Sequence, residues 1–273
     1  MTIPPWTGEV PLVDTHCHLT NGRFDADRPA VMEGLAPALW RTMTIGTGLE
    51  DGRAARALAQ THPDRIACAV GLDPHSCFEA DAHFETHLLG LDALLSEGGF
   101  SALGEIGLEY YHQLLPKPIQ REQFGLQLDL AKRHDLPVVI HLRDAWEDGL
   151  DVLRAHPGVR GVIHSFTGDE QQARACLDLG YHLSFNGTVT YKANDTLRQA
   201  ARIVPADRLL VETDTPYLPP LPLRGRRNEP GWVAAVVRLL AEVRGEREDD
   251  VAAWTTQNAC GLFRWPLPPA WGR

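Results

Sequence analysis

Residues 11–18 of this chain read PLVDTHCH, an apolar start that ends in two histidines separated by one residue. Seven further apolar runs follow, beginning near residues 41, 66, 101, 136, 159, 180 and 207. Their mean spacing of about 28 residues leaves room for one strand, one loop and one helix, which is typical of parallel strands joined by crossover helices. Runs 66–70, 137–140 and 208–211 are apolar on successive residues, as expected for strands covered on both faces.

Segments with helical periodicity lie between the apolar runs. The clearest is 120–135, in which Phe124, Leu128 and Ala131 recur on one side. We expect further helices over 54–61, 81–96, 170–179, 232–243 and 249–263. Eight strand and helix units in roughly 250 residues predict a closed (β/α)8 barrel of the TIM type, with residues 1–273 as a single domain.

A doubly wound open sheet is the alternative fold. That fold carries a Gly-rich phosphate loop after its first strand, whereas here the first strand leads into His16 and His18. The closed barrel is therefore favoured.

Composition excludes several classes of protein. The 273 residues include 26 Lys and Arg against 36 Asp and Glu, a formal net charge of -10, so any binding of nucleic acid must be local. No apolar run is long enough for a membrane span, and the start lacks the basic flank and apolar segment of a signal peptide. Five widely spaced cysteines without a Cys-x-x-Cys pair fit a reducing compartment. We expect a cytoplasmic protein without an obligate protein partner.

Polar residues follow the apolar runs where the strands are expected to end. His16 and His18 lie two positions apart on an extended segment, so both imidazoles point to the same side. Candidate ligands directly follow four later runs, and these are Glu105, His141, His164, and Glu212 with Asp214. Because barrel strands bring their carboxyl ends to one rim, we expect these side chains to converge. Without a metal, such a set would leave like-charged carboxylates and unpaired donors together, so the pattern predicts metal binding.

Without Glu212, these candidates give six ligands. Six ligands are more than one tetrahedral site needs, which predicts two divalent ions bridged by Glu105. In this hypothesis His16, His18 and Asp214 complete one site. His141 and His164 complete the other, and a shared water is the nucleophile. Asp214 accepts the proton of that water, while Glu212 orients it, binds a further ion or forms a salt-bridged wall. Imidazoles favour Zn²⁺ or Mn²⁺ and phosphoryl chemistry commonly uses Mg²⁺, so the metal stays open.

Together these segments resemble the TatD family of metal-dependent hydrolases, within the wider amidohydrolase-like barrels. The resemblance rests on VDTHCHL at 13–19, GEIGLEYY at 104–111, PVVIHLRDA at 137–145, GVIHSFTG at 161–168, LVETDTPYL at 210–218 and RNEP at 227–230. It implies a metallo-dependent hydrolase barrel that cleaves phosphodiester bonds, usually as a deoxyribonuclease and often as an exonuclease from the 3′ end. It also supports the ligand roles given above.

Two positions depart from the family pattern. Asp73 stands in GLDPH, residues 71–75, where the family usually shows Gly-x-His-Pro-His, and a carboxylate there would oppose a bound anion. Glu109 stands where the family tends to have Asp, which keeps the charge and lengthens the side chain. Neither change touches the six expected ligands, but Asp73 bears on substrate preference and rate.

Arginines, aromatic residues and one histidine near the expected rim are candidates for substrate binding. The candidates are Arg143, Arg224, Arg226, Arg227, Tyr110, Tyr111, Phe166 and His75. Guanidinium groups hold phosphate oxygens bidentately, and aromatic rings stack on unpaired bases without reading their sequence. These residues predict a single-stranded or frayed nucleic-acid end as substrate.

The ligand pattern predicts a two-metal hydrolase, and the family resemblance implies that it cleaves phosphodiester bonds of DNA or RNA as a 3′–5′ exonuclease. Two alternatives stay open at this point. The same metal chemistry serves small esters, amides and the ester of aminoacyl-tRNA, because this barrel is used with many substrates. The second alternative is a module that binds nucleic acid or protein and uses its metal only for structure.

Overall fold

The computed structural model describes residues 2–35 and 39–271. Eight parallel strands form one sheet in which each strand pairs with the next along the chain. The strands are β1 (Leu12–Cys17), β2 (Leu39–Thr47), β3 (Ile66–Gly71), β4 (Ala102–Glu109), β5 (Val138–Arg143), β6 (Gly161–Ile163), β7 (His182–Phe185) and β8 (Leu209–Val211). Each begins within two residues of the position expected from the apolar runs, so the strand prediction is confirmed.

The first and last strands meet at the carboxyl end of the sheet. The N–H of Asp214, just after β8, donates to the carbonyl of His16 in β1 at 2.9 Å. The carboxylate of Asp14 accepts the N–H of Thr213 at 2.8 Å and its hydroxyl at 2.7 Å. These bonds close the ring, so the barrel prediction is confirmed and the open sheet is excluded.

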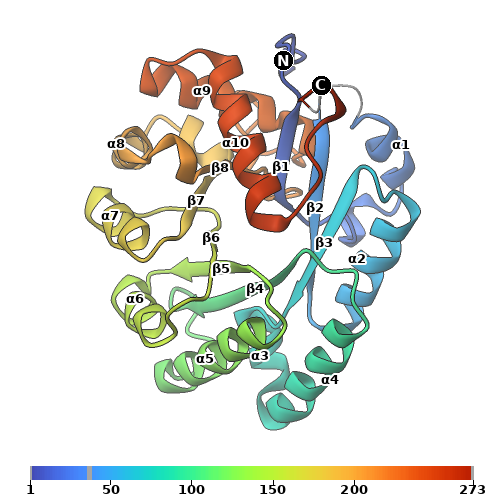
Figure 1. The fold of residues 1–273 in the computed structure, drawn as a ribbon, viewed down its shortest axis with the longest axis vertical. Helices are drawn as coiled ribbons and strands as arrows, with labels where there is room; N and C mark the ends of the chain where they lie inside the picture. The colour runs from blue at the N-terminus through green and yellow to red at the C-terminus, as the bar shows by residue number, and fades with distance from the viewer. Residues whose placement is uncertain (1, 36–38, 272–273) are drawn as a thin grey trace.

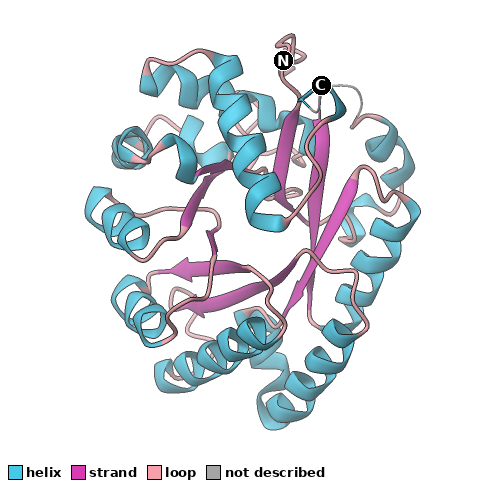
Figure 2. Ribbon diagram, in the orientation of Figure 1, coloured by secondary structure: helices cyan, strands magenta, loops and turns pink. Residues whose placement is uncertain are grey.

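Helices surround the ring of strands on its outer side (Figures 1 and 2). They are α1 (Arg28–Glu33), α2 (Leu49–Thr61), α3 (Pro74–Ala80), α4 (Phe84–Ser96), α5 (Lys117–Arg133), α6 (Trp146–Ala155), α7 (Glu170–Asp178), α8 (Asp195–Ile203), α9 (Val233–Arg244) and α10 (Glu248–Phe263). The expected helices correspond to α2, α4, α5, α7, α9 and α10, although α4 begins at Phe84 after a 3-10 turn. Across residues 2–35 and 39–271, no helix is both long and apolar enough to cross a membrane.

Apolar side chains form two main layers and a further small cluster that includes Phe24 and Ala55. The larger layer lies between strands and helices, and it buries Phe124 and Leu128 of α5 as their spacing predicts. The smaller layer fills the barrel interior, where Val13 and Val139 pack together with Phe263 at the end of α10. Figure 1 shows α10 beside β1 and β8. Since α10 packs against this interior layer, the polar rim at the carboxyl ends of the strands is left for a functional site.

Candidate metal centre

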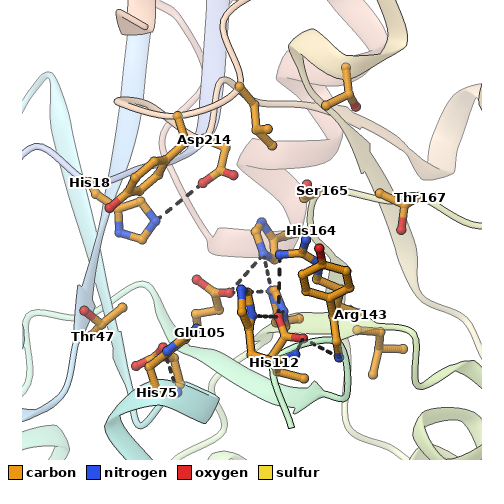
Figure 3. Close-up of a pocket in the computed structure, with 18 of the residues that line it drawn as sticks. His18, Thr47, His75, Glu105, His112, Arg143, His164, Ser165, Thr167 and Asp214 are labelled. Atoms are coloured by element: carbon orange, nitrogen blue, oxygen red, sulfur yellow. Dashed lines mark hydrogen bonds and ion pairs between the residues drawn. The ribbon is translucent and has the colours of Figure 1, made fainter. Parts of the chain in front are cut away.

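A pocket of about 890 Å³ opens at the carboxyl end of the barrel. Five of the six expected ligands line it, namely His18, Glu105, His141, His164 and Asp214. The sixth, His16, is fully buried and contacts the others. Figure 3 shows His18 and Asp214 facing Glu105 and His164 across the pocket. The structure thus brings the sequence-predicted ligands together, although they come from five different strand ends.

One group of ligands comes from β1 and the segment after β8. The Nε2 atoms of His16 and His18 lie 3.2 Å apart, so both imidazoles point to the same side, as the strand alternation predicted. Asp214 Oδ1 lies 3.5 Å from His18 Nε2 and 3.7 Å from His16 Nε2. Asp214 has a φ of 57°, a left-handed conformation that is unfavourable for residues with a side chain. Its N–H bond to His16 holds that conformation in place.

Glu105 joins this group to the histidines of β5 and β6. Its Oε1 lies 2.8 Å from His141 Nδ1 and 3.1 Å from His164 Nε2. Its Oε2 lies 3.6 Å from His16 Nε2. One oxygen therefore faces His141 and His164 while the other faces His16, so the carboxylate lies between imidazoles of β1 and those of β5 and β6.

An irregularity in β4 positions Glu105. Gly104 pairs with Val139 and Ile106 with Ile140, so Glu105 is an extra residue without a register partner on β5. Such bulges redirect a side chain locally. Gly107 has a φ of 147°, and a Cβ there would collide with the carbonyl oxygen of His141. Glycine at this position is what allows β4 and β5 to approach beside the site.

A second carboxylate contacts the far side of each of two histidines. Glu212 is fully buried, and its Oε1 lies 3.3 Å from His164 Nδ1 and accepts the N–H of Ser165 at 2.6 Å. Glu109 Oε2 lies 3.4 Å from His141 Nε2. Carboxylates in this position fix the orientation and tautomer of a ligating imidazole. The roles expected for Glu212 did not include this one, since its contacts favour the orientation of His164.

The charges of the site follow from burial and mutual contact. Burial raises the pKa of Glu105, but His164 and His141 outweigh it and hold that pKa well below its usual range. Burial also acts to lower the pKa of His141, yet Glu105 and Glu109 raise it to about 9. In the absence of metal, His141 therefore carries a proton that a bound cation must displace, so cation binding releases protons.

The donor set fits divalent cations. Burial, followed by the neighbouring His164, holds the pKa of His16 well below its usual range, which keeps the ring neutral as a ligand must be. Among the described residues, His16 Nδ1 is buried without a hydrogen-bond partner. Its Nε2 faces His18, Glu105 and Asp214. Four imidazoles and two carboxylates thus lie together, in the overlapping groups of His16, His18 and Asp214 and of His16, Glu105 and His164, with His141 in contact with Glu105.

Asp73 lines the same pocket. Its carboxylate accepts the N–H of His75 at 3.2 Å and both the N–H and hydroxyl of Ser76, at 3.2 and 2.5 Å. Burial, and then the neighbouring Glu105, raises its pKa. Asp73 therefore holds the start of α3, and its negative charge lies in the wall of the pocket.

Two neighbouring tyrosines lie in different places. Tyr111 lines the pocket with 60% of its surface exposed, and the Arg143 guanidinium lies 4.2 Å from its ring centre. Tyr110 is outside the lining, and its hydroxyl donates to Asp148 at 2.7 Å. Phe166 is 1% exposed and packs in the core. Of the three aromatic candidates, Tyr111 is the one that faces the pocket.

The arginine patch after β8 does not line the pocket. Arg227 forms two bonds to Asp27, at 2.6 and 2.7 Å. Arg224 lies over the ring of Tyr191 at 4.9 Å, and Arg226 lies 5.9 Å from the ring centre of Trp232. Arg143 is the basic candidate that reaches the site, together with His75.

Sequence reasoning missed Tyr217, which lines the pocket and is 45% exposed. Its ring centre lies 6.0 Å from that of His18, and its hydroxyl accepts a bond from Asn21 at 3.1 Å. Its place three residues beyond Asp214 was the available signal, because residues just after a barrel strand lie at the catalytic rim.

A (β/α)8 barrel with imidazole and carboxylate ligands at its strand ends defines the class of metal-dependent hydrolases. Comparison with known proteins gives the particular family. The model of the TatD related DNase family matches residues 13–264. The chain therefore belongs to the TatD family.

Individual relatives match over nearly their whole length. The chain is 37% identical over 256 residues to YabD of Bacillus subtilis, an uncharacterized metal-dependent hydrolase, covering 93% of this chain and 99% of YabD. It is 36% identical over 256 residues to the 3′-5′ ssDNA/RNA exonuclease TatD of Rahnella sp., covering 90% and 95%. The crystal structure of YJJV, a TatD homolog from Escherichia coli, superposes with a TM-score of 0.84 at 31% identity, covering 93% and 98%.

Proposed function

We propose that this hydrolase cleaves phosphodiester bonds at the 3′ end of single-stranded DNA or RNA. The observation that carries the proposal is the position of Glu105 between two histidine groups, in a pocket whose wall also presents Tyr111 and Arg143. The relative in Rahnella named as a 3′-5′ ssDNA/RNA exonuclease supports the substrate. Several other relatives are named only as metal-dependent hydrolases, so the substrate is the part that needs testing.

Each ligand has a role in this proposal. His16, His18 and Asp214 would hold one divalent cation, and His141 and His164 would hold another, with Glu105 between them. Bound cations of this kind lower the pKa of a water molecule and offset charge on the phosphate. The side chain of Asp214 is 13% exposed toward the pocket, where its carboxylate accepts the proton released during hydrolysis.

Substrate contacts come from the wall of the pocket. The exposed ring of Tyr111 stacks on a base, which tolerates any sequence. Arg143 is held beside that ring and donates to a phosphate oxygen. Tyr217 offers a further exposed ring next to His18. A pocket of about 890 Å³ has room for a terminal nucleotide.

The test uses a single-stranded oligonucleotide labelled at the 3′ or the 5′ end. The chelated protein is given Mg²⁺, Mn²⁺ or Zn²⁺, alongside Asp214→Asn and the matched control Asp207→Asn, whose carboxylate lies on the surface. We expect metal-dependent shortening from the 3′ end that Asp214→Asn slows by roughly 10²-fold or more and Asp207→Asn leaves intact. Absence of cleavage with every metal would contradict the nuclease proposal.

Asp73 favours a second candidate, hydrolysis of a small ester or amide or of the ester of aminoacyl-tRNA. Its carboxylate in the pocket wall disfavours an anion near it. A panel of chromogenic esters and a charged aminoacyl-tRNA, assayed with the same variants, separates the candidates. Turnover of these esters without cleavage of the oligonucleotide would contradict the nuclease proposal and support the second candidate.

A further inference from the structure

We propose that His75, Glu109 and His112 form a third cation site on the wall of the same pocket. One ligand atom from each residue lies within 4.8 Å of the other two. His75 lies in the first turn of α3, Glu109 ends β4, and His112 follows in the next loop. Figure 3 shows His75 and His112 on the same side of the pocket, away from Asp214. The three residues thus converge from separate segments onto a place outside the candidate groups of His16, His18 and Asp214 and of His16, Glu105 and His164.

The carboxylate of Glu109 has room for a cation. Its Oε1 accepts the N–H groups of Tyr111 at 2.8 Å and His112 at 3.2 Å. Its Oε2 lies 3.4 Å from His141 Nε2, 3.3 Å from His112 Nδ1 and 3.8 Å from Arg143 Nη1. A cation that takes the place of the His112 contact leaves both backbone bonds of Oε1 intact. Burial of Glu109 and its backbone bonds keep the carboxylate in a fixed orientation.

The two histidines supply the adjustable part of the site. The side chain of His112 is 41% exposed, and the ring centres of His75 and His112 lie 5.4 Å apart. Both rings border the open pocket. Three protein ligands leave further coordination positions open toward the pocket, as in catalytic rather than structural metal sites.

The charge of the pocket provides an independent argument, which rests on the proposed nucleic-acid substrate. Six carboxylates line the pocket, from Asp51, Asp73, Glu105, Glu109, Asp144 and Asp214. One guanidinium, that of Arg143, opposes them. With neutral histidines, two divalent cations still leave a net negative wall, whereas a third makes it positive. A phosphate chain enters a positive pocket far more readily.

The ligand set also indicates the kind of ion. Two imidazoles and one carboxylate suit Zn²⁺ or Mn²⁺ better than Mg²⁺, which prefers oxygen ligands and retains its water. Because its histidines are more exposed than those of the inner groups, the third site binds more weakly and fills last.

The experiment counts bound metal and needs no nucleic acid, so its result is independent of the nuclease proposal. Chelated protein is dialysed against increasing Zn²⁺ and its metal content is measured by elemental analysis. We expect three equivalents in the native protein and in the control His87→Ala, whose ring lies on α4 outside this pocket. The variants His112→Ala and His75→Ala should each bind two equivalents of Zn²⁺. The affinities for these two ions should differ from those of the native protein by less than about two-fold.

Two results would overturn the proposal. The first is saturation of the native protein at two equivalents, and the second is a third equivalent that persists in His112→Ala. Anomalous diffraction at the zinc edge from the loaded native protein gives a separate reading. A peak between His75, Glu109 and His112 is expected, and a third peak elsewhere would refute the site.

Discussion

The ring of His164 is held by Glu212 from behind, with Nδ1 of the histidine 3.3 Å from Oε1 of the carboxylate. The other ring nitrogen of His164 lies 3.1 Å from Glu105. The carboxylate of Glu212 is itself fixed by the N–H of Ser165. One carboxylate thus orients the imidazole that a cation would use, and the other contacts the nitrogen that faces the pocket.

Replacing Glu212 with Gln should weaken cation binding without removing a direct ligand. The neutral amide stabilises the ligating tautomer of His164 less well, and losses of about 10- to 100-fold in metal affinity are usual for such contacts. Competition with a chromophoric chelator measures the change, with the exposed Glu50→Gln as control. Equal affinities for Glu212→Gln and the native protein would show that the contact does not orient a ligand.

Glu105→Gln should affect both inner cations at once. An amide cannot bridge two cations as a carboxylate does, so we expect both inner equivalents to bind weakly and hydrolysis to fall by roughly 10³-fold. Metal analysis after gel filtration in dilute metal checks the first part. Retention of two tightly bound equivalents would mean that Glu105 is not shared.

Arg143 and Arg227 should differ in what they support. Arg143→Ala removes the guanidinium that lies in the pocket beside Tyr111, so KM for an oligonucleotide should rise and its dependence on salt should weaken. Arg227→Ala removes a bidentate pair with Asp27, so its main effect should be a lower thermal midpoint. Steady-state kinetics over a range of salt, together with thermal unfolding, separate the two. A larger rise in KM for Arg227→Ala would restore the patch after β8 as the phosphate contact.

His182 should make stability depend on pH at the opposite end of the barrel. Burial, and then the nearby Arg208, lowers the pKa of His182 from 6.5 to about 4. As the pH falls from 6.5 toward 4, the unfolded chain takes up this proton and the folded protein does not, so the folded protein loses stability. Between pH 7 and pH 5 the difference amounts to about 2 kcal/mol.

His182→Gln removes this dependence because Gln does not titrate. When the pH is lowered from 7 to 5, the free energy of unfolding should therefore fall by about 2 kcal/mol less in the variant than in the native protein. Urea unfolding of both chelated proteins at the two pH values measures it. If the free energies of unfolding of the two proteins differ by the same amount at both pH values, His182 takes up its proton equally in the folded and unfolded states.

The strands and the clustering of the candidate ligands were predictable from the sequence for one physical reason. Strands covered on both faces have continuous apolar runs, and their ends converge in a barrel, so His141 and Asp214 could be assigned to one rim before any coordinates. The helices α1, α3, α6 and α8 were not singled out. Of these, α1 and α3 have six and seven residues, which leaves few apolar positions from which to recognise a period.

The residues that line the wall of the pocket and are proposed to contact substrate were less predictable, because most of them lie in loops. Tyr110 and Tyr111 are adjacent in the sequence, and neither composition nor spacing indicates which of them faces the pocket. Arg227 was expected at the rim from its position after β8, but Asp27, far away in the sequence, pairs with it. Contacts between loops distant in the sequence leave no periodic signal, so they emerge only in the folded structure.

The closure between β1 and β8 also sets an order during synthesis. His16 and His18 emerge from the ribosome early, whereas Asp214 follows only after most of the barrel has been translated. Their backbone bond cannot form before Asp214 has left the ribosome, so a shorter nascent chain lacks one carboxylate of the candidate metal centre. A fragment that ends before residue 214 is therefore expected to lack the complete ligand set.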